Sequence, residues 1–385
     1  MITCKHFGSC GGCTHLDISY KDELAIKKKM LKETLAPYDH LIQNIIPAPS
    51  PEGYRNKMEL AFGDESKDGK LALGIRKRRS FYEVASVEEC VLIPNDFKQI
   101  AALVQDYFRK SGEAFFHRKR HIGSLRHLVI RRGEFTGEIL IILSTTSGLN
   151  TPLEPLISLL KNRKLDSKIV GILHSVNDGV ADVVRQDNTS TLWGQDYYHE
   201  KICGLTFKVS AFSFFQTNSA GAVVLYDTIK EMALTKKASS AYDLYCGTGT
   251  IAQVISPHFD NVIGVELNTD AIIAAKENAR LNNITNCEFI AGDVQIIFEG
   301  KSPDITIVDP PRDGLHPKAL AKLIALAPPI LVYVSCKLSS LARDLVALTK
   351  AGYQPTKAAG VDMFPRTPHV EAIMLLCRSE KHIQY

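Results

Sequence analysis

The pattern of apolar and polar positions changes near residue 206. Beyond that point, apolar runs of strand length alternate with amphipathic stretches of helix length, as in a doubly wound α/β sheet. We expect strands at 241–245, 261–266, 287–290, 304–309 and 330–335, and helices at 250–256, 269–282, 317–327 and 338–350. The second half of the chain therefore predicts a Rossmann-like α/β fold.

The first half has a less regular pattern, in which one amphipathic helix precedes several short strands. A stripe of leucine and methionine predicts a helix from Ser19 to Leu35, with Lys27, Lys28 and Lys29 on the exposed side. Strand-like runs follow at 59–62, 128–131, 139–143 and 170–175. We expect two domains, an α/β region at residues 1–205 and the doubly wound region at 206–385.

Composition places the chain among ordinary soluble proteins. It has 385 residues, of which 45% are hydrophobic and 23% charged, enough to bury a sizeable core. The start lacks the apolar stretch of a signal peptide, and no segment is long and apolar enough to span a membrane. We therefore expect a cytoplasmic protein without membrane association. In that reducing compartment the nine cysteines are expected to be thiols, metal ligands or catalysts.

Positive charge is concentrated in two stretches. The first is residues 76–79, and the second, residues 117–132, has six Lys or Arg side chains, three histidines and no acid. Arginine at this density suits phosphate oxygens. The alternative is that these side chains pair with acids distant in sequence. We interpret residues 1–205 as a region that binds nucleic acid.

Three cysteines lie close together at the N-terminus. Cys4, Cys10 and Cys13 are separated by glycines that allow a tight fold, and Cys90 is the best candidate for a fourth ligand. Four thiolates suit either zinc or an iron–sulfur cluster, and spacing alone favours zinc. His6 and His15 are alternative ligands. The sequence thus predicts a metal site without deciding the metal.

A glycine-bearing turn at residues 243–250 follows the first predicted strand of the second half. Glu266 ends the next strand, where an acid can bind ribose hydroxyls. Ala252 stands at the third glycine position of a dinucleotide motif, which leaves NAD possible. Asp243 and Asp293 add acids at two further strand regions. These carboxylates better suit S-adenosylmethionine, which carries an amino group and a sulfonium instead of a pyrophosphate.

Two residues could supply a nucleophile and a base. Cys336 follows the predicted strand at 330–335, at the sheet edge where α/β enzymes act. Taken alone, it is more simply explained as a core cysteine. Glu371 begins a later apolar run, and Asp309-Pro310-Pro311-Arg312 forms a rigid turn after another strand. Together they favour a catalytic cysteine.

Several ordered motifs resemble those of the RNA (uracil-5-)methyltransferase family. They are residues 214–218, 243–250, 309–315, 333–336 and 362–371. The resemblance spans nearly the whole chain and implies a class I methyltransferase fold that uses S-adenosyl-L-methionine. Cys4, Cys10, Cys13 and Cys90 resemble the ligands of a [4Fe–4S] cluster in the bacterial rRNA branch, which favours iron–sulfur over zinc.

The resemblance also implies roles for individual residues. The Cys336 thiolate would add to carbon 6 of a flipped uracil, and Glu371 would remove the proton from carbon 5 after methyl transfer. Six residues would contact the methyl donor, namely Gln216, Tyr245, Thr250, Glu266, Asp293 and Asp309. The expected reaction forms 5-methyluridine.

Some positions depart from the family pattern. Lys337 stands where asparagine is common, and Arg366 where histidine is frequent. The chain begins almost at Cys4, so we expect no TRAM module, although the cysteine segment resembles the branch that carries one. The expected partner is RNA, with 23S rRNA as the leading target, and the expected state is a monomer. The alternatives are a tRNA uridine, or a non-catalytic iron–sulfur RNA-binding protein.

Overall fold

A computed structural model describes residues 4–181, 184, 188–294 and 302–379. The chain divides into two compact units that interleave along the sequence. Unit 1 comprises Met1–Ser19, Ser50–Lys201 and Lys208–Ser219, and unit 2 comprises Tyr20–Pro49, Ile202–Phe207 and Ala220–Tyr385.

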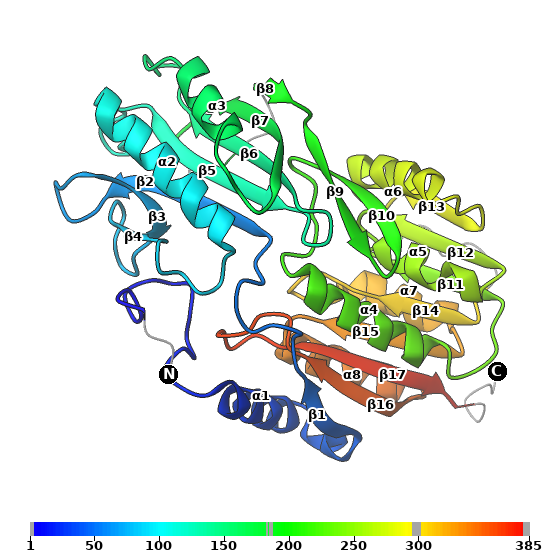
Figure 1. Ribbon diagram of the computed structural model, residues 1–385. Coiled ribbons are helices and arrows are strands. Elements are labelled where there is room, and N and C mark those ends of the chain that lie inside the picture. The colour runs from blue at the N-terminus through cyan, green and yellow to red at the C-terminus, as the bar shows by residue number, and fades with distance from the viewer. Residues whose placement is uncertain (1–3, 182–183, 185–187, 295–301, 380–385) are drawn as a thin grey trace. The chain divides into compact units, whose positions relative to one another are not determined.

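Unit 1 is built on a seven-stranded sheet with the order β4-β3-β2-β5-β6-β7-β8 (Figure 1). Its strands are β2 (Lys57–Asp64), β3 (Leu71–Arg76), β4 (Val84–Ser86), β5 (Leu125–Arg132), β6 (Glu138–Thr145), β7 (Lys168–Val176) and β8 (Thr189–Gly194). All neighbours are antiparallel except β6 and β7, which are parallel. The four strands predicted in this half are confirmed as β2, β5, β6 and β7.

Two helices pack on this sheet. Helices α2 (Asn95–Ser111) and α3 (Glu154–Lys161) lie over the strands in Figure 1. Val104 of α2 and Leu156 of α3 line an apolar space together with Leu128 and Ile141 of the sheet. One face of the sheet is therefore buried beneath helices, which explains the apolar runs of β5 and β6.

Unit 2 is built on an eight-stranded sheet with the order β1-β16-β17-β15-β14-β11-β12-β13. Its strands are β1 (Ile42–Ile46), β11 (Ser240–Leu244), β12 (Asn261–Glu266), β13 (Cys287–Ala291), β14 (Ile305–Val308), β15 (Ile330–Ser335), β16 (Tyr353–Val361) and β17 (Glu371–Arg378). The five strands from β13 to β15 are parallel, whereas β17 is antiparallel to β15. The predicted doubly wound sheet is confirmed.

Helices cover both faces of this sheet, with α4 and α5 in front of the strands and α7 and α8 behind them in Figure 1. The helices of this half are α4 (Ser219–Ala233), α5 (Thr250–Ile255), α6 (Thr269–Leu281), α7 (Pro317–Leu326) and α8 (Leu338–Lys350). Leu323 of α7 and Leu345 of α8 pack with Leu331 and Met374 in one core cluster.

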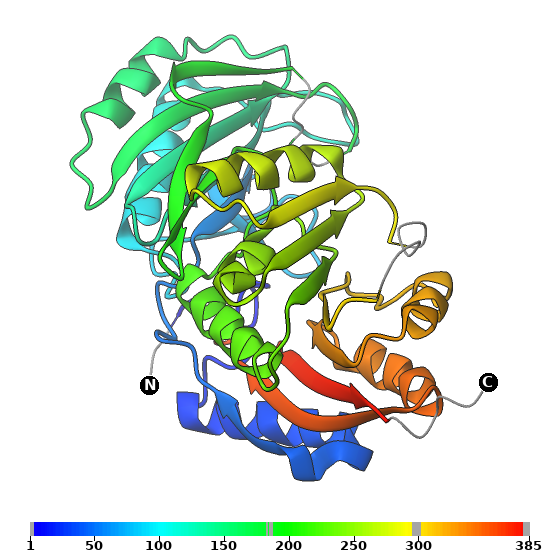
Figure 2. The ribbon, with the colours of Figure 1, turned by 90° about the vertical axis from the view of Figure 1, so that its right-hand side faces the viewer.

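The first helix and strand belong to unit 2. Helix α1 (Tyr20–Thr34) leads through the short 3-10 helix η1 (Ala36–Leu41) to β1, which pairs in parallel with β16 (Figure 2). Leu31 and Leu35 enter the same core cluster as Leu345. The predicted division into residues 1–205 and 206–385 therefore differs from the two compact units, because residues 20–49 pack with the C-terminal sheet.

The expectation that Lys27 is exposed is wrong. Glu23, Lys27 and Leu31 lie on one buried face of α1, since residues four apart share a helix face. The ammonium of Lys27 contacts Glu23 at 2.8 Å and Asp362 at 2.7 Å, and these side chains have no exposed surface or almost none. Lys27 is thus part of a buried ionic network.

Strands β9 (Tyr197–Ile202) and β10 (Leu205–Ser210) form a separate two-stranded sheet. Among the helices of the described residues, none combines the length and apolar character needed to cross a membrane.

Candidate active site and cysteine pocket

The candidate catalytic and binding side chains of unit 2 lie where its parallel strands end. Strands β12, β11, β14 and β15 are consecutive neighbours, so their carboxyl ends share one edge of the sheet. Glu266 ends β12, Tyr245 follows β11, Asp309 follows β14 and Cys336 follows β15. The sequence prediction for this edge is confirmed in position, and the chemistry of each residue depends on its surroundings.

Cys336 and Glu371 are brought together by the antiparallel pairing of β15 with β17. Ser335 pairs with Ala372 in this ladder. Cys336 directly follows Ser335 and Glu371 directly precedes Ala372, so this register brings the two residues opposite each other at the end of the ladder, and Glu371 is near enough to contribute to the pKa of the Cys336 thiol. Cys336 is half-buried, whereas Glu371 is only 7% exposed. A thiol and a carboxyl group that are 35 positions apart in sequence therefore face one site.

The surroundings of this pair hold protons on both groups. Burial raises the pKa of Glu371 to about 8, and the Asp309 carboxylate adds to the rise while Arg312 opposes it. Burial also raises the pKa of the Cys336 thiol, with further contributions from Glu371 and Asp309 and an opposing one from Arg312. Burial raises the pKa of Asp309 itself to about 6. Titratable groups perturbed together at a sheet edge are typical of catalytic sites.

Helix α8 fixes the turn that carries Asp309 and Arg312. The carboxylate of Asp344 accepts hydrogen bonds from the Leu315 N–H at 2.9 Å and from the Tyr333 hydroxyl at 2.7 Å. The Ser340 hydroxyl donates to the Arg312 carbonyl at 2.8 Å. Asp344 is 1% exposed, so one buried carboxylate links the turn to β15.

Lys337, the first departure from the family pattern, also contacts this turn. Its ammonium lies 3.8 Å from the Asp313 carboxylate, and both side chains are substantially exposed. Its backbone N–H donates to the Ser335 hydroxyl at 3.2 Å. An exposed pair of this kind contributes little to stability, so Lys337 stays on the solvent side of the nucleophile loop.

Arg366, the second departure, is buried and contacts helix α1. Its backbone N–H donates to Glu23 Oε1 at 2.7 Å, and its guanidinium lies 3.7 Å from Glu23 Oε2. It has a positive φ of 68° and lies over the ring of Tyr20. With Lys27 bound to Asp362, both ends of the segment 362–366 are tied to α1. This segment leads directly to Glu371.

The turn after β11 has the conformation expected of a ligand-binding loop. Gly247 and Gly249 have positive φ values of 52° and 72°. A Cβ on Gly249 would lie 2.5 Å from the ring of Phe289, so glycine is required there. Tyr245 also has a positive φ, of 64°, a conformation that non-glycine residues adopt mainly where function or packing imposes it.

Acidic side chains surround this turn. Glu266 accepts hydrogen bonds from the Gly247 N–H at 3.2 Å and the Asn268 N–H at 2.9 Å. Asp293 lies close enough to contribute to the rise that burial produces in the pKa of Tyr245, to about 12. Thr250 is buried at the start of α5. Four of the six predicted donor-binding residues, with Asp309 as a fifth, thus belong to unit 2.

Asp243 joins the candidate binding residues. Its Oδ2 accepts the Ala252 N–H at 2.9 Å, while its Oδ1 is buried without a hydrogen-bond partner among the described residues. Burial raises the pKa of this carboxyl to about 8, and Asp309 and Glu266 add to the rise. An orphaned carboxylate oxygen beside the glycine turn suits a ligand with a positive charge. Its position on β11 was the signal in the sequence.

Gln216 belongs to unit 1, whereas the other five predicted donor-binding residues belong to unit 2. Its carbonyl accepts a hydrogen bond from the Asn56 side chain at 3.0 Å, and that side chain also donates to Ser219 at 2.7 Å. Phe215 is buried, whereas Phe214 is 75% exposed. The motif 214–218 is therefore anchored to the start of β2.

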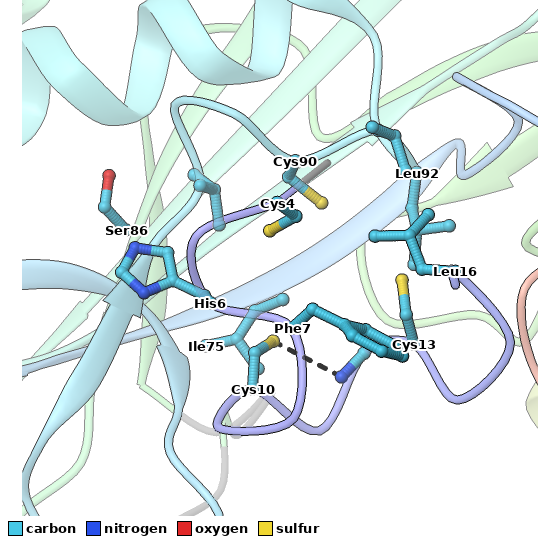
Figure 3. A pocket seen from close by; sticks show the side chains of 13 residues that line it. Cys4, His6, Phe7, Cys10, Cys13, Leu16, Ile75, Ser86, Cys90 and Leu92 are labelled. Carbon is cyan, nitrogen blue, oxygen red and sulfur yellow. Dashed lines mark hydrogen bonds between the residues drawn. The ribbon is translucent and has the colours of Figure 1, made fainter. Parts of the chain in front are cut away.

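The four predicted metal-binding cysteines line one pocket in unit 1. Figure 3 shows the sulfur atoms of Cys4, Cys10, Cys13 and Cys90 around this space, which is partly open to solvent. Apolar side chains such as Leu16, Ile75 and Leu92 complete the lining, and Gly12 donates its N–H to the Cys10 sulfur at 3.3 Å. His6 also lines the pocket, whereas His15 does not.

The cysteines of this pocket are not arranged around a metal ion. Among the residues that the structure describes, no three His, Cys, Asp or Glu side chains are arranged to hold a metal ion. Burial raises the pKa of Cys13 to about 12, and the neighbouring thiols add to the rise. Four thiolates are the ligand type of either a zinc ion or an iron–sulfur cluster.

The basic stretch 117–132 divides into a buried and an exposed part. Arg126 and Arg131 are 2% and 1% exposed. Arg126 donates to the carbonyls of Asn177 and Gly179, and Arg131 to those of Ser210 and Ala211. These two guanidinium groups bind backbone oxygens within unit 1, so they are not available to phosphates. Lys119 and Arg120 remain exposed.

Two family models match the second half of the chain. A model described as a methyltransferase domain matches residues 235–327, and one described as tRNA (Uracil-5-)-methyltransferase matches residues 294–379. An uncharacterized RNA methyltransferase of Clostridium tetani is 44% identical over 98% of this chain and 84% of its own length. Another from Clostridium acetobutylicum is 45% identical over 97% of this chain and 83% of its own length.

A solved structure extends this likeness to both units. The tRNA (uracil-54, C5)-methyltransferase of Pyrococcus abyssi, in complex with S-adenosyl-L-homocysteine, is 29% identical to this chain. The match covers 96% of this chain and 86% of that one, with a TM-score of 0.79.

Proposed function

Because the chain belongs to the RNA (uracil-5-)methyltransferase family, we propose that it methylates carbon 5 of a uridine in 23S rRNA. The observation that carries this proposal is the position of Cys336 opposite Glu371 at the carboxyl edge of the unit 2 sheet. A nucleophile and a base on one face of a methyltransferase sheet are what uracil methylation requires.

The thiolate of Cys336 begins the reaction. Carbon 5 of uracil is a weak nucleophile, so the thiolate adds to carbon 6 and moves electron density to carbon 5. S-adenosyl-L-methionine, when bound, supplies an electrophilic methyl group on its sulfonium. Carbon 5 forms a bond to that methyl group as the bond between the methyl group and the sulfonium breaks, and carbon 5 becomes tetrahedral. The target base has to leave its stack for the thiol to reach carbon 6.

Glu371 completes the reaction. Its carboxylate takes the remaining proton from carbon 5, the electron pair restores the double bond between carbons 5 and 6, and the Cys336 thiolate leaves. A pKa of about 8 makes this carboxylate a stronger base than an ordinary one. The products are 5-methyluridine, S-adenosyl-L-homocysteine, the free thiolate and a protonated Glu371.

We assign methyl donor binding to Gln216, Tyr245, Thr250, Glu266, Asp293 and Asp309. The orphaned Oδ1 of Asp243 supports the assignment, because the donor carries a cationic amino group and a sulfonium. Glu266 already accepts the Gly247 N–H, and its remaining lone pairs suit the ribose hydroxyls of the same donor. The residues present therefore fit the group.

We further propose that Cys4, Cys10, Cys13 and Cys90 hold a [4Fe–4S] cluster. Four thiols around one pocket are the ligand type of such a cluster, and the resemblance of these cysteines to those of the bacterial rRNA branch favours iron–sulfur over zinc. The cluster has a structural role in this proposal, and no step of the methylation passes through it. In functional terms, residues 1–205 then carry the cluster and bind RNA, and residues 206–385 carry out methyl transfer.

A trapping experiment tests the reaction. In RNA that contains 5-fluorouridine, carbon 5 has no proton for Glu371 to remove, so the enzyme stays bound to the methylated base through Cys336. We expect a covalent adduct with the wild-type protein and with Cys377→Ala, whose thiol lies at the far end of β17. No adduct is expected with Cys336→Ala. An adduct of normal yield in that variant would reject the nucleophile, and no adduct in the wild-type protein would favour a non-catalytic RNA-binding protein.

A tRNA uridine is the second candidate target. The observation that favours it is the likeness to the Pyrococcus abyssi enzyme, which is a tRNA methyltransferase. Mapping 5-methyluridine in both RNA pools of a strain that lacks this gene distinguishes the two. Loss of a modified site from 23S rRNA supports the leading proposal, and loss from tRNA alone replaces it.

A further inference from the structure

We propose that an aromatic–basic surface of unit 1 stacks against unpaired bases of the RNA substrate. We define this surface by Phe81, Tyr82, Phe115, His117 and Lys119. It deepens the proposed function, and it rests on RNA being the substrate. Neither the sequence motifs nor the buried arginines of β5 identify it.

Two segments distant in sequence build this surface, and glycines allow each to close. The turn 77–83 joins β3 to β4, and the Tyr82 carbonyl accepts the Asp64 N–H at 3.0 Å. A Cβ on Gly63 would lie 2.0 Å from that carbonyl oxygen. In the second segment, a Cβ on Gly123 would lie 2.0 Å from the Phe115 carbonyl oxygen. The surface is therefore a fixed feature of the fold.

The rings of the two segments pack against one another. Tyr82 stacks on His117 with ring centroids 4.1 Å apart and planes at 26°. The ring centroids of Phe115 and Phe81 lie 6.0 Å and 6.4 Å from that of Tyr82. Phe81 is 64% exposed. Packing holds the inner rings in place, while the outermost ring is left open to solvent.

Cations surround the exposed ring. The Lys119 ammonium lies 5.5 Å from the centroid of the Phe81 ring, and Arg78, Arg79 and Arg120 are exposed on the same two segments. The only acid of the turn 77–83, Glu83, is paired with Lys77 at 3.0 Å. The surface thus combines an open ring with several exposed cations.

This combination fits single-stranded RNA. Aromatic rings bind unpaired bases by stacking, and nearby Lys and Arg side chains bind the phosphates that flank them. Bases inside a duplex are already stacked, so a duplex offers only its phosphates. We infer that the surface prefers single-stranded over double-stranded RNA, and that Phe81 contributes most of the difference.

The test measures binding of the full-length protein to fluorescently labelled oligouridylate, and to an RNA duplex of equal length. We expect Phe81→Ala to bind oligouridylate about tenfold more weakly, with little change for the duplex, and Phe81→Trp to restore binding. Phe135→Ala is the matched control, because Phe135 is also exposed in unit 1, at 52%. Lys119→Ala should weaken binding to both RNAs. It should also reduce the salt dependence of binding by the equivalent of about one phosphate contact.

Three results would overturn the proposal. The first is unchanged oligouridylate binding in Phe81→Ala. The others are a loss of oligouridylate binding in Phe135→Ala or in Phe81→Trp as large as that in Phe81→Ala. An unchanged unfolding midpoint for Phe81→Ala confirms that the fold is intact. Methyl transfer is measured separately. A protein that binds as expected but forms no adduct with 5-fluorouridine RNA would disprove the proposed function and leave this surface standing.

Discussion

Cys336 lies opposite Glu371, one position beyond the Ser335–Ala372 pair that ends the β15–β17 ladder. This antiparallel pair is what turns two residues distant in sequence into one reactive unit. On the neighbouring turn, Asp309 raises the pKa of both groups and Arg312 lowers it. The reactivity of the site therefore depends on four side chains from three strand ends.

Replacing Glu371 by Gln should stop the reaction after methyl transfer. The amide cannot accept the carbon 5 proton, so we expect the methylated RNA to remain bound to Cys336 on ordinary, unfluorinated substrate. Turnover should fall by about 10²–10⁴-fold, and denaturing gels with labelled RNA should reveal the adduct. Glu288→Gln, at an exposed position of β13, is the control. Normal turnover in Glu371→Gln would exclude Glu371 as the base.

The rate should rise with pH through the region near 8. Catalysis needs the Cys336 thiolate and the Glu371 carboxylate, and burial raises the pKa of both groups, that of Glu371 to about 8. Both groups are therefore mostly protonated below that pH, and activity is lost as pH falls. The measurement is the pH profile of kcat/KM.

Substitutions beside the pair should move this profile in opposite directions. Asp309→Asn removes a negative charge that raises both pKa values, so the acidic limb should shift to lower pH. Arg312→Gln removes a positive charge that lowers them, so the limb should shift to higher pH. The position of the limb, unlike the absolute rate, does not depend on losses in donor binding. Shifts in the same direction would contradict the assignment.

The edge of the unit 2 sheet could be predicted from the sequence because buried parallel strands appear as continuous apolar runs. The residue that follows such a run lies at the carboxyl edge, as Asp309 and Cys336 do. The opposition of Cys336 and Glu371 could not be predicted, since it depends on the register of an antiparallel pair. Local patterns carry no information about that register.

Charged side chains were the least predictable part of the chain. Lys27 has the same local pattern as the exposed Lys29, yet its partner Asp362 is 335 positions away. Arg126 and Arg131 likewise bind carbonyls distant in sequence. A charged side chain on a strand or helix is expected to be exposed to solvent unless its partner is known. Only the fold reveals these pairs.

Replacing Lys27 by Ala should destabilise the protein and impair the action of Glu371 as the base. Removing the ammonium leaves the buried Asp362 without its Lys27 partner and leaves Glu23 with Arg366 as its cation, which costs about 3–5 kcal/mol. Chemical denaturation measures the loss. Lys29→Ala, which breaks only the exposed pair with Glu33, should cost less than about 0.5 kcal/mol. Small and equal losses of unfolding free energy in Lys27→Ala and Lys29→Ala would show that the buried network contributes little to stability.

The same network should position the base. Arg366→Ala removes the guanidinium contact with Glu23 and leaves the backbone N–H bond to that carboxylate, and the loosened segment should let Glu371 move from its place opposite Cys336. We expect kcat to fall while KM for RNA changes little, with partial accumulation of the covalent adduct seen in Glu371→Gln. A change in KM alone would instead assign Arg366 to RNA binding.

The cysteine pocket makes a prediction independent of activity. Anaerobically purified protein should be brown, with visible absorption from an iron–sulfur cluster, and replacing any of Cys4, Cys10, Cys13 or Cys90 by Ala should remove the colour. Cys203→Ala is the control, because Cys203 does not line the pocket. Metal analysis that finds zinc in a colourless wild-type protein would overturn the cluster.

Loss of the cluster should also weaken RNA binding. The cysteine loop contacts the turn 77–83 directly, since Arg78 donates its backbone N–H to Ser9 at 2.7 Å and Cys10 forms a β-bridge with Lys77. That turn carries Phe81, so a disordered loop should displace the aromatic–basic surface. We expect Cys10→Ala to bind oligouridylate about as weakly as Phe81→Ala, and combining the two substitutions should add little, because both remove the same contact. Full additivity would show that the pocket and the surface act independently.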